Sequence, residues 1–376
     1  MFWQREYIRE AVSMTLNDTY KLDLPEHGLL GSLLLRISGS QASDWGINGG
    51  DWRIIDKIEE IEIIINGATV GKSLKGDLVQ AAAFYDNKIV APDVWRDYAT
   101  NTQWCYIMLD FGRFLNDIDY GLDLDRHDNV EIRIKNNATT DHFSDLTVSL
   151  MGIYLRDVAS GQFKGYLRTE EWRKWTTVAD ETKYLDLPTE FLLRRIIMQA
   201  VPNVDSDNVE TTGMHNLMDD VELNMKSGQI KVYKGGIDDL LRDNYWAYGG
   251  PIITGGFPYR NADKGINMGL GYVMAAVAGA GANDGAGAGT LPTIEAARTS
   301  FTQKMETFEA DSPVGMICMG VGYHNTVVFR FDYSPDVNLW LDPDARKTVE
   351  LNIHTRNISA AASGVNKVIL DRLVKY

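Results

Sequence analysis

The most suggestive chemical motif is a glycine-rich turn followed by a lysine and a serine, at residues 67–73. The segment Gly-Ala-Thr-Val-Gly-Lys-Ser resembles the loop with which many enzymes wrap a nucleotide phosphate. That loop needs four residues between its glycines, and this chain has three. Asn66 and Gly67 form a pair that favours a two-residue β-hairpin turn, because both positions of that turn need positive φ. We therefore expect a hairpin here and no nucleotide cofactor.

Metal and nucleophile chemistry has little support in the sequence. The six histidines include no His-x-His or His-x-x-x-His pair, the spacing that commonly holds a metal ion in double-sandwich enzymes. Aspartates crowd residues 117–128 and 336–344, but their order does not match a calcium-binding loop, so we expect solvated acids or turn formers. Cys105 and Cys318 lie in apolar runs and are expected to be reduced core thiols. We find no serine nucleophile elbow, and expect no catalytic, metal or cofactor-binding residue.

The composition also limits the kind of partner. The formal net charge of the 376 residues is −15 and the sequence pI is about 4.9. A protein that holds nucleic acid through a broad surface needs clustered Lys and Arg to neutralise phosphates, so direct sequence-specific nucleic-acid binding is not expected. The sequence has no secretory leader pattern and no run of the roughly 20 apolar residues that a membrane-spanning helix needs.

The chain contains an internal repeat. Three pairs of segments follow one another in the same order in its two halves, and the offset between partners grows from 160 to 219 residues, which leaves about 59 extra residues in the second copy. These residues coincide with Gly/Ala-rich sequence, which predicts an inserted loop at about 249–300. The pairs are residues 22–25 with 185–188, 58–63 with 218–223, and 130–134 with 349–353.

Within each copy the pattern indicates β-strands. Residues 130–134 alternate apolar and polar side chains with the period of two that a half-buried strand has. Residues 77–85 could form a short helix between strands. Regularly spaced short strands separated by turns favour a sandwich or a barrel over a parallel α/β fold. The expected fold class is therefore all-β, with two related modules in tandem.

The expected domains follow from the repeat. Helical spacing at Trp3, Tyr7, Ala11 and Met14 predicts an N-terminal helix, and similar spacing predicts a short C-terminal helix. The expected boundaries are an N-terminal helix at 1–19, a first β-module at 20–158, a connection at 159–182, a second β-module at 183–358 and a C-terminal helix at 359–376.

This arrangement resembles the double jelly-roll major capsid proteins of tailless icosahedral viruses, the lineage that includes the adenovirus hexon. The resemblance rests on the N-terminal helix expected before the first module, on Leu-Asp-Leu-Pro at the start of both modules, on Ile-Ile-Ile-Asn-Gly at 63–67, on the strand-like segment 147–150 and on the long insertion. It implies that the modules at 20–158 and 183–358 are two tandem jelly-roll sandwiches in an all-β chain. It also implies a structural protein without enzymatic activity. Three copies would form a pseudo-hexameric capsomer, and capsomers would tile an icosahedral shell.

The resemblance also implies partners and a location. The partners are further copies of the chain, neighbouring capsomers, other virion proteins such as a vertex protein, and, as a further candidate, an internal lipid membrane. The protein is expected in the virion capsid after assembly in the host cytoplasm. The aromatic and basic side chains near the N-terminus are candidates for an inner-surface or subunit contact, namely Phe2, Trp3, Arg5, Tyr7 and Arg9.

Two other functions fit two β-sandwich modules. A carbohydrate-binding protein would expose tryptophans on a sheet face, and a glycan-processing hydrolase would carry paired acids in a cleft between the modules. The tryptophans that could serve the first function are Trp52, Trp95, Trp104, Trp172, Trp175, Trp246 and Trp340.

Overall fold

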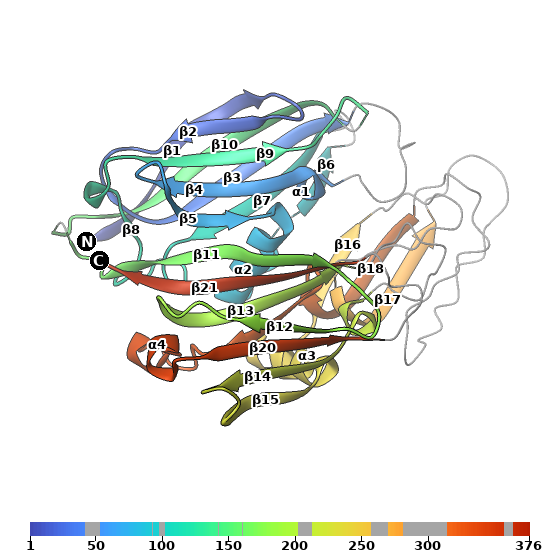
Figure 1. Cartoon of the computed structure of the whole chain (residues 1–376). Coiled ribbons are helices and arrows are strands. Elements are labelled where there is room, and N and C mark those ends of the chain that lie inside the picture. The colour runs from blue at the N-terminus through green and yellow to red at the C-terminus, as the bar shows by residue number, and fades with distance from the viewer. Residues whose placement is uncertain are drawn as a thin grey trace.

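Strands dominate the structure, a computed structural model that describes residues 1–41, 53–91, 93–97, 102–141, 143–159, 161–201, 213–256, 270–280, 314–356 and 364–376. Within these residues the chain forms 21 β-strands in four sheets, with short helices between them (Figure 1). None of the helices in these ranges is long and apolar enough to cross a membrane. The expected all-β class is confirmed.

The first jelly roll is formed by ten strands and three short helices. They are β1 (Phe2–Met14), β2 (Thr19–Asp23), β3 (Leu29–Gln41), α1 (Ile54–Lys57), β4 (Ile58–Ile65), β5 (Thr69–Leu74), α2 (Gly76–Asn87), β6 (Asp93–Asp97), β7 (Thr102–Asp110), β8 (Leu122–Asp123), η1 (Leu124–Arg126), β9 (Val130–Asn136) and β10 (Phe143–Arg156). One layer, the first sheet, has the order β1-β10-β3-β7-β6, with β8 paired to β3. The opposing layer has the order β2-β9-β4-β5.

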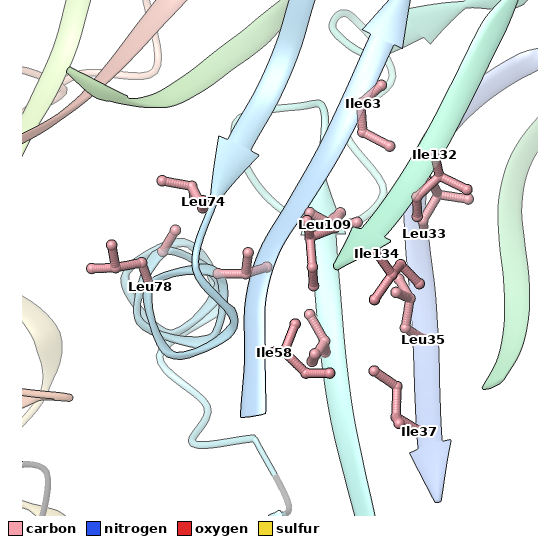
Figure 2. Close-up of a cluster of buried hydrophobic side chains, with 14 of the residues drawn as sticks. Leu33, Leu35, Ile37, Ile58, Ile63, Leu74, Leu78, Leu109, Ile132 and Ile134 are labelled. Carbon is pink, nitrogen blue, oxygen red and sulfur yellow. The ribbon is translucent and has the colours of Figure 1, made fainter. Parts of the chain in front are cut away.

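Alternating apolar residues build the core between these layers. Every second residue of β3, including Leu33, Leu35 and Ile37, is buried and belongs to one hydrophobic cluster with residues of β4 and β9 such as Ile63 and Ile134 (Figure 2). The turn before β5 has positive φ at both Asn66 (51°) and Gly67 (74°), which confirms the expected hairpin. Helix α2 confirms the expected helix at 77–85.

The second jelly roll repeats this plan. Its elements are β11 (Gly165–Thr176), β12 (Thr182–Asp186), β13 (Leu192–Val201), η2 (Met214–Asn216), β14 (Met218–Met225), β15 (Ile230–Gly236), α3 (Ile237–Tyr248), β19 (Thr326–Arg330), η3 (Val337–Leu339), α4 (Pro343–Arg346), β20 (Val349–Thr355) and β21 (Val365–Lys375). The layer β19-β13-β21-β11 packs on the layer β12-β20-β14-β15. Buried residues of both layers, such as Ile196, Leu370 and Leu351, form its core.

The insertion of the second copy contains strands of its own. β16 (Ile252–Gly256), β17 (Leu270–Ala280) and β18 (Val314–Tyr323) form a three-stranded sheet in the order β16-β18-β17. The rest of the loop expected at about 249–300 lies outside the described residues.

The repeat allows residues of the two modules to be matched one to one. β13 follows β3 at an offset of 163 residues, and α3 follows α2 at an offset of 161. The pairings agree with these offsets: Leu155 pairs with Leu29 in the first module, and Leu373 pairs with Leu192 in the second. Residues that hold the same place in the two sets of pairings are called equivalent below.

Both ends of the chain are strands where helices were expected. Residues 1–19 contain β1, which pairs antiparallel with β10, and residues 359–376 contain β21. The register of β1 shifts between Tyr7 and Arg9 and again between Arg9 and Val12. Each bulge adds a residue to the period of two, so the apolar spacing imitates a helix. The helix expected at the C-terminus was wrong for another reason. β21 is buried on both faces and carries an almost continuous apolar run, which removes the alternation typical of a strand.

The segment 159–182, expected to be a connection, contains β11. This strand pairs with β21 and, through its other edge, with β5, so it is an integral part of the second jelly roll.

Gly165, at the start of β11, gives a test of this packing. It has a φ of +156°, and a Cβ added there would lie 2.2 Å from the Val374 carbonyl oxygen, which is backbone and cannot move aside. We expect Gly165→Ala to lower the free energy of unfolding by about 2 kcal/mol or more in urea titrations. Gly67→Ala is the control, because Gly67 has a φ of +74° with nothing within 4 Å. Equal losses for the two variants would contradict the steric argument.

Candidate functional site

The two jelly rolls are joined edge to edge. β11 of the second module lies parallel to β5 of the first, with Thr169 opposite Lys72 and Glu170 opposite Ser73. This pairing merges one layer of each module into a single eight-stranded sheet with the order β19-β13-β21-β11-β5-β4-β9-β2 (Figure 1). We call this contact, together with the helix that covers it, the seam.

Helix α2 fills the space between the modules. Ten of its twelve residues are buried, because it packs on its own module and is also covered by the outer face of the second. Ile197, Val328 and Ile369 on that outer face belong to the hydrophobic cluster of the first module. The hydroxyl oxygen of Tyr85, on α2, lies 2.8 Å from Thr326 Oγ1. The core of the first module therefore extends onto the outer face of the second, whose own core is a separate cluster.

Buried charges lie in the middle of the seam. Asp86, at the end of α2, forms ion pairs with Arg194 (2.6 Å) and Arg195 (2.8 Å), two neighbouring residues of β13. Arg195 Nε also lies 2.8 Å from Asp371 Oδ2 on β21, and Arg194 Nε lies 3.0 Å from Asp332 Oδ2. The side chains of Asp86, Arg194, Arg195 and Asp371, called the seam quartet below, are almost completely buried.

Lys72 extends this network to the paired strands. Its Nζ donates to Thr169 Oγ1 (3.0 Å), and Thr169 in turn donates to Asp371 Oδ1 (3.0 Å). Burial lowers the pKa of Lys72, while nearby carboxylates, first that of Asp371, act in the opposite direction. Lys72 is the lysine of the phosphate-loop-like motif, so the structure gives it a role between modules.

Burial is the largest influence on the pKa values of Asp86 and His324 in the seam. It raises the pKa of Asp86 to about 6, against the attraction of Arg195 and Arg194. It lowers the pKa of His324 to about 4. The His324 ring lies 2.8 Å from Gln80 Oε1 of α2, so this neutral imidazole also bridges the modules.

The five N-terminal candidates all lie on β1, at the open edge of the first sheet. Phe2, Arg5, Tyr7 and Arg9 are exposed, while Trp3 is half-buried and packs against the cluster around Leu29, Leu155 and Phe163. The structure therefore brings them together on an edge strand rather than on a helix face. Their role as a contact stays a prediction.

Other candidates of the sequence have structural roles. Asp117 and Asp119 hold Arg113 in ion pairs of 2.7 and 3.0 Å, and Cys105 is buried. In the described part of the chain no group of three His, Cys, Asp or Glu residues is arranged to hold a metal ion. Trp340 is buried and Trp246 is exposed on α3; Trp52 and the side chain of Trp95 lie outside the described residues, as does the side chain of Cys318.

A shallow surface groove of about 450 Å³ runs beside β1. Its lining includes Glu6, Asp23 and Glu26, with Arg9 and Arg156 as cations. The groove belongs to the first module and is open to solvent, so it is not the cleft between modules that a glycan-processing enzyme was expected to have.

The sequence contains a signal for the seam quartet that the apolar periodicity does not reveal. Arg194 and Arg195 interrupt the apolar strand 192–201, and Asp371 and Arg372 interrupt the apolar strand 365–375. Charged residues are almost never fully buried unless they are paired. Opposite charges inside two such strands could have indicated a buried ion pair between them.

Two jelly rolls in tandem, each with its own core and joined in one sheet, define the double jelly-roll fold. Solved structures with this fold that resemble the chain are viral major capsid proteins. The STIV major capsid protein matches with a TM-score of 0.61 and 10% identity, over 100% of this chain and 97% of the other. Major capsid protein P2 from bacteriophage PM2 matches with a TM-score of 0.52 and 11% identity, over 100% and 98%.

The PBCV-1 virus capsid gives a third match, with a TM-score of 0.54 and 9% identity over 99% and 94% of the two chains. At these identities the likeness establishes the fold. No protein-family model matches the chain, and no curated protein matches its sequence.

Removing one cation tests the seam quartet. We expect Arg195→Ala to lower the free energy of unfolding by about 3–5 kcal/mol, because it leaves Asp86 and Asp371 buried with too little positive charge. The control is Arg168→Ala, which breaks a partly exposed pair with Glu170 and should cost no more than about 1 kcal/mol. Similar values in chemical denaturation would show that the quartet does not hold the modules together.

The pH dependence of stability can separate the contribution of Asp86 from that of His324. The folded protein binds a proton at Asp86 at higher pH than the unfolded chain does, so the Asp86 contribution to stability rises as pH falls from 6 to 4. The lowered pKa of His324 has the opposite effect in the same range. Asp86→Asn removes only the first contribution. As pH falls, this variant should lose stability more steeply than the unmodified protein, by about 1 kcal/mol per pH unit.

The control for this titration is Asp128→Asn, the same chemical change at an exposed position. Its stability profile should run parallel to that of the unmodified protein between pH 4 and 7. A parallel profile for Asp86→Asn as well would contradict a raised pKa at Asp86.

Proposed function

We propose that this chain is the major capsid protein of a tailless icosahedral virus. Three copies form a pseudo-hexameric capsomer of six jelly rolls, and capsomers tile the shell. The observation that carries the proposal is the joining of two equivalent jelly rolls through one merged sheet and a buried apolar interface, in a fold that matches capsid proteins along the whole chain. Six similar modules in a ring give a block with six similar sides, which suits near-hexagonal packing.

The role is structural rather than enzymatic. The most densely charged buried cluster among the described residues is closed by its own ion pairs and joins modules instead of facing solvent. The net charge of −15 is consistent with a shell component that leaves the genome to other proteins. The partners in this proposal are further copies of the chain, a vertex protein and an internal lipid membrane. The protein is assembled in the host cytoplasm and resides in the virion.

The solution mass tests this proposal. Multi-angle light scattering on the purified protein should give a species of about 126 kDa, three times the 42.1 kDa chain, unchanged over a hundredfold range of concentration, or larger shells built from it. Electron micrographs of that species should show blocks with a six-sided outline. A monomer at micromolar concentration would contradict the proposal and would direct attention to glycan binding and glycan hydrolysis.

A further inference from the structure

Each half of the seam has an equivalent elsewhere on the chain that no other described strand or helix of the same copy covers. The strand β1 is equivalent to β11, and β15 is equivalent to β5. β1 and β15 are the end strands of their sheets, whereas β11 and β5 pair with each other. Likewise α3 is equivalent to α2, but only five of its residues are buried, against ten in α2.

The outer face of the first sheet is a partly exposed copy of a buried surface. Leu34, Met108 and Met151 lie side by side on this face and are partly exposed. Their equivalents in the second module are Ile197, Val328 and Ile369, each no more than 1% exposed beneath α2. The first sheet therefore presents the apolar half of a seam without its helix.

The helix α3 presents the other half. Trp246 is 76% exposed, and its equivalent on α2 is Tyr85, which is 4% exposed. Tyr85 contacts Thr326, which is fully buried, and the equivalent of Thr326 is Tyr106, which is 37% exposed. One buried contact of the seam thus corresponds to two exposed aromatic side chains on separate surfaces.

The polar contacts of the seam correspond to pairs of opposite charge. Gln199 Nε2 donates to Asp77 of α2 (3.1 Å), and the equivalent residues are Arg36 and Asp238. In the strand pairing, Glu170 lies opposite Ser73, and the equivalent residues are Glu6 and Lys234. Both pairs would attract when the open surfaces meet.

The seam quartet has no charged equivalent. Asp86 and Asp371 correspond to Ala247 and Ile153, and the two arginines Arg194 and Arg195 correspond to Gly31 and Ser32. All four charges are replaced together. If only some of the four charges were replaced, joining the two open surfaces would bury the remaining ones without partners. Because all four are replaced, no unpaired charge is buried at these positions.

We propose that α3 and β15 of one copy dock on β1 and the outer face of the first sheet of a second copy, which repeats the in-chain seam between chains. Trp246 then packs on Tyr106 of the next copy, Asp238 meets its Arg36, and β15 pairs parallel with its β1. This assignment rests on the proposed capsomer, because alternating in-chain and between-chain seams give a ring of six modules from three chains. A head-to-tail contact of this kind closes into a ring when its rotation divides a full turn.

Truncating the aromatic anchor tests the assignment. We expect Trp246→Ala to weaken trimer formation at least tenfold in light scattering over a dilution series, because a central aromatic residue carries much of the affinity of an interface. The control is Tyr184→Ala, which removes an aromatic side chain of similar exposure (70%) from β12 and should leave the trimer unchanged. Unfolding curves of both variants report whether each monomer remains folded.

Charge reversal tests the register. Asp238→Arg and Arg36→Asp should each weaken the trimer, and the chain that carries both changes should regain it, because the attraction is restored with opposite sign. Asp238 also lies 3.6 Å from Arg356 in its own chain. The combined variant lacks this pair just as Asp238→Arg does, so its recovery does not depend on the pair. Failure of the combined variant to recover, with its monomer folded, would overturn the proposed contact.

Cysteine pairing tests the strand contact directly. A chain that carries both Glu6→Cys and Lys234→Cys should form a covalent trimer on mild oxidation, since paired parallel strands bring these positions within disulfide reach. Each variant with only one of the two substitutions should stay monomeric on a denaturing gel. A trimer by light scattering that gives no crosslink and tolerates Trp246→Ala would overturn this inference and leave the proposed function standing. A monomeric unmodified protein would overturn both.

Discussion

The pairing of β5 with β11 is the contact on which the rest of the structure depends. Without it the chain would be two sandwiches on a linker, and the relative orientation of the modules would vary. The parallel ladder fixes their edges, α2 fills the space beside it, and the seam quartet lies in the middle. Buried charges are expensive unless they are paired, and Asp86 of the first module meets Arg194 and Arg195 only when both modules are in place, so one orientation is strongly favoured.

The repeat explains how one chain presents two kinds of surface. Both modules follow the same plan, with one bulge at an equivalent place in β3 and β13, but their outer faces differ in what covers them. On the second module the face is apolar with polar groups that reach α2, and it is buried. On the first module the equivalent face carries longer, more flexible side chains, such as Met108 and Met151, and remains partly open.

The sequence predicted the coarse organisation better than the details of contact. The repeat, the β-class, the Asn66-Gly67 hairpin and the α2 helix could all be read from local pattern, because each depends on neighbouring residues. The terminal strands could not, because bulges in β1 disturbed the alternation and burial of both faces removed it from β21. The seam was also beyond local pattern: Lys72 and Asp371 lie 3.0 Å from the same Thr169 hydroxyl group, although 299 residues separate them in the sequence.

The bulges of β1 have a further consequence for solubility. An open edge strand is a template on which any extended segment can add, and aggregation through such edges is a general hazard of sheet proteins. The two register shifts break the regular row of hydrogen-bonding groups on β1, and Arg5, Glu6, Arg9 and Glu10 place charges of both signs along it. A strand of arbitrary sequence would meet mismatched spacing and charge. The irregular edge thus protects the chain from fibrous, cross-β growth.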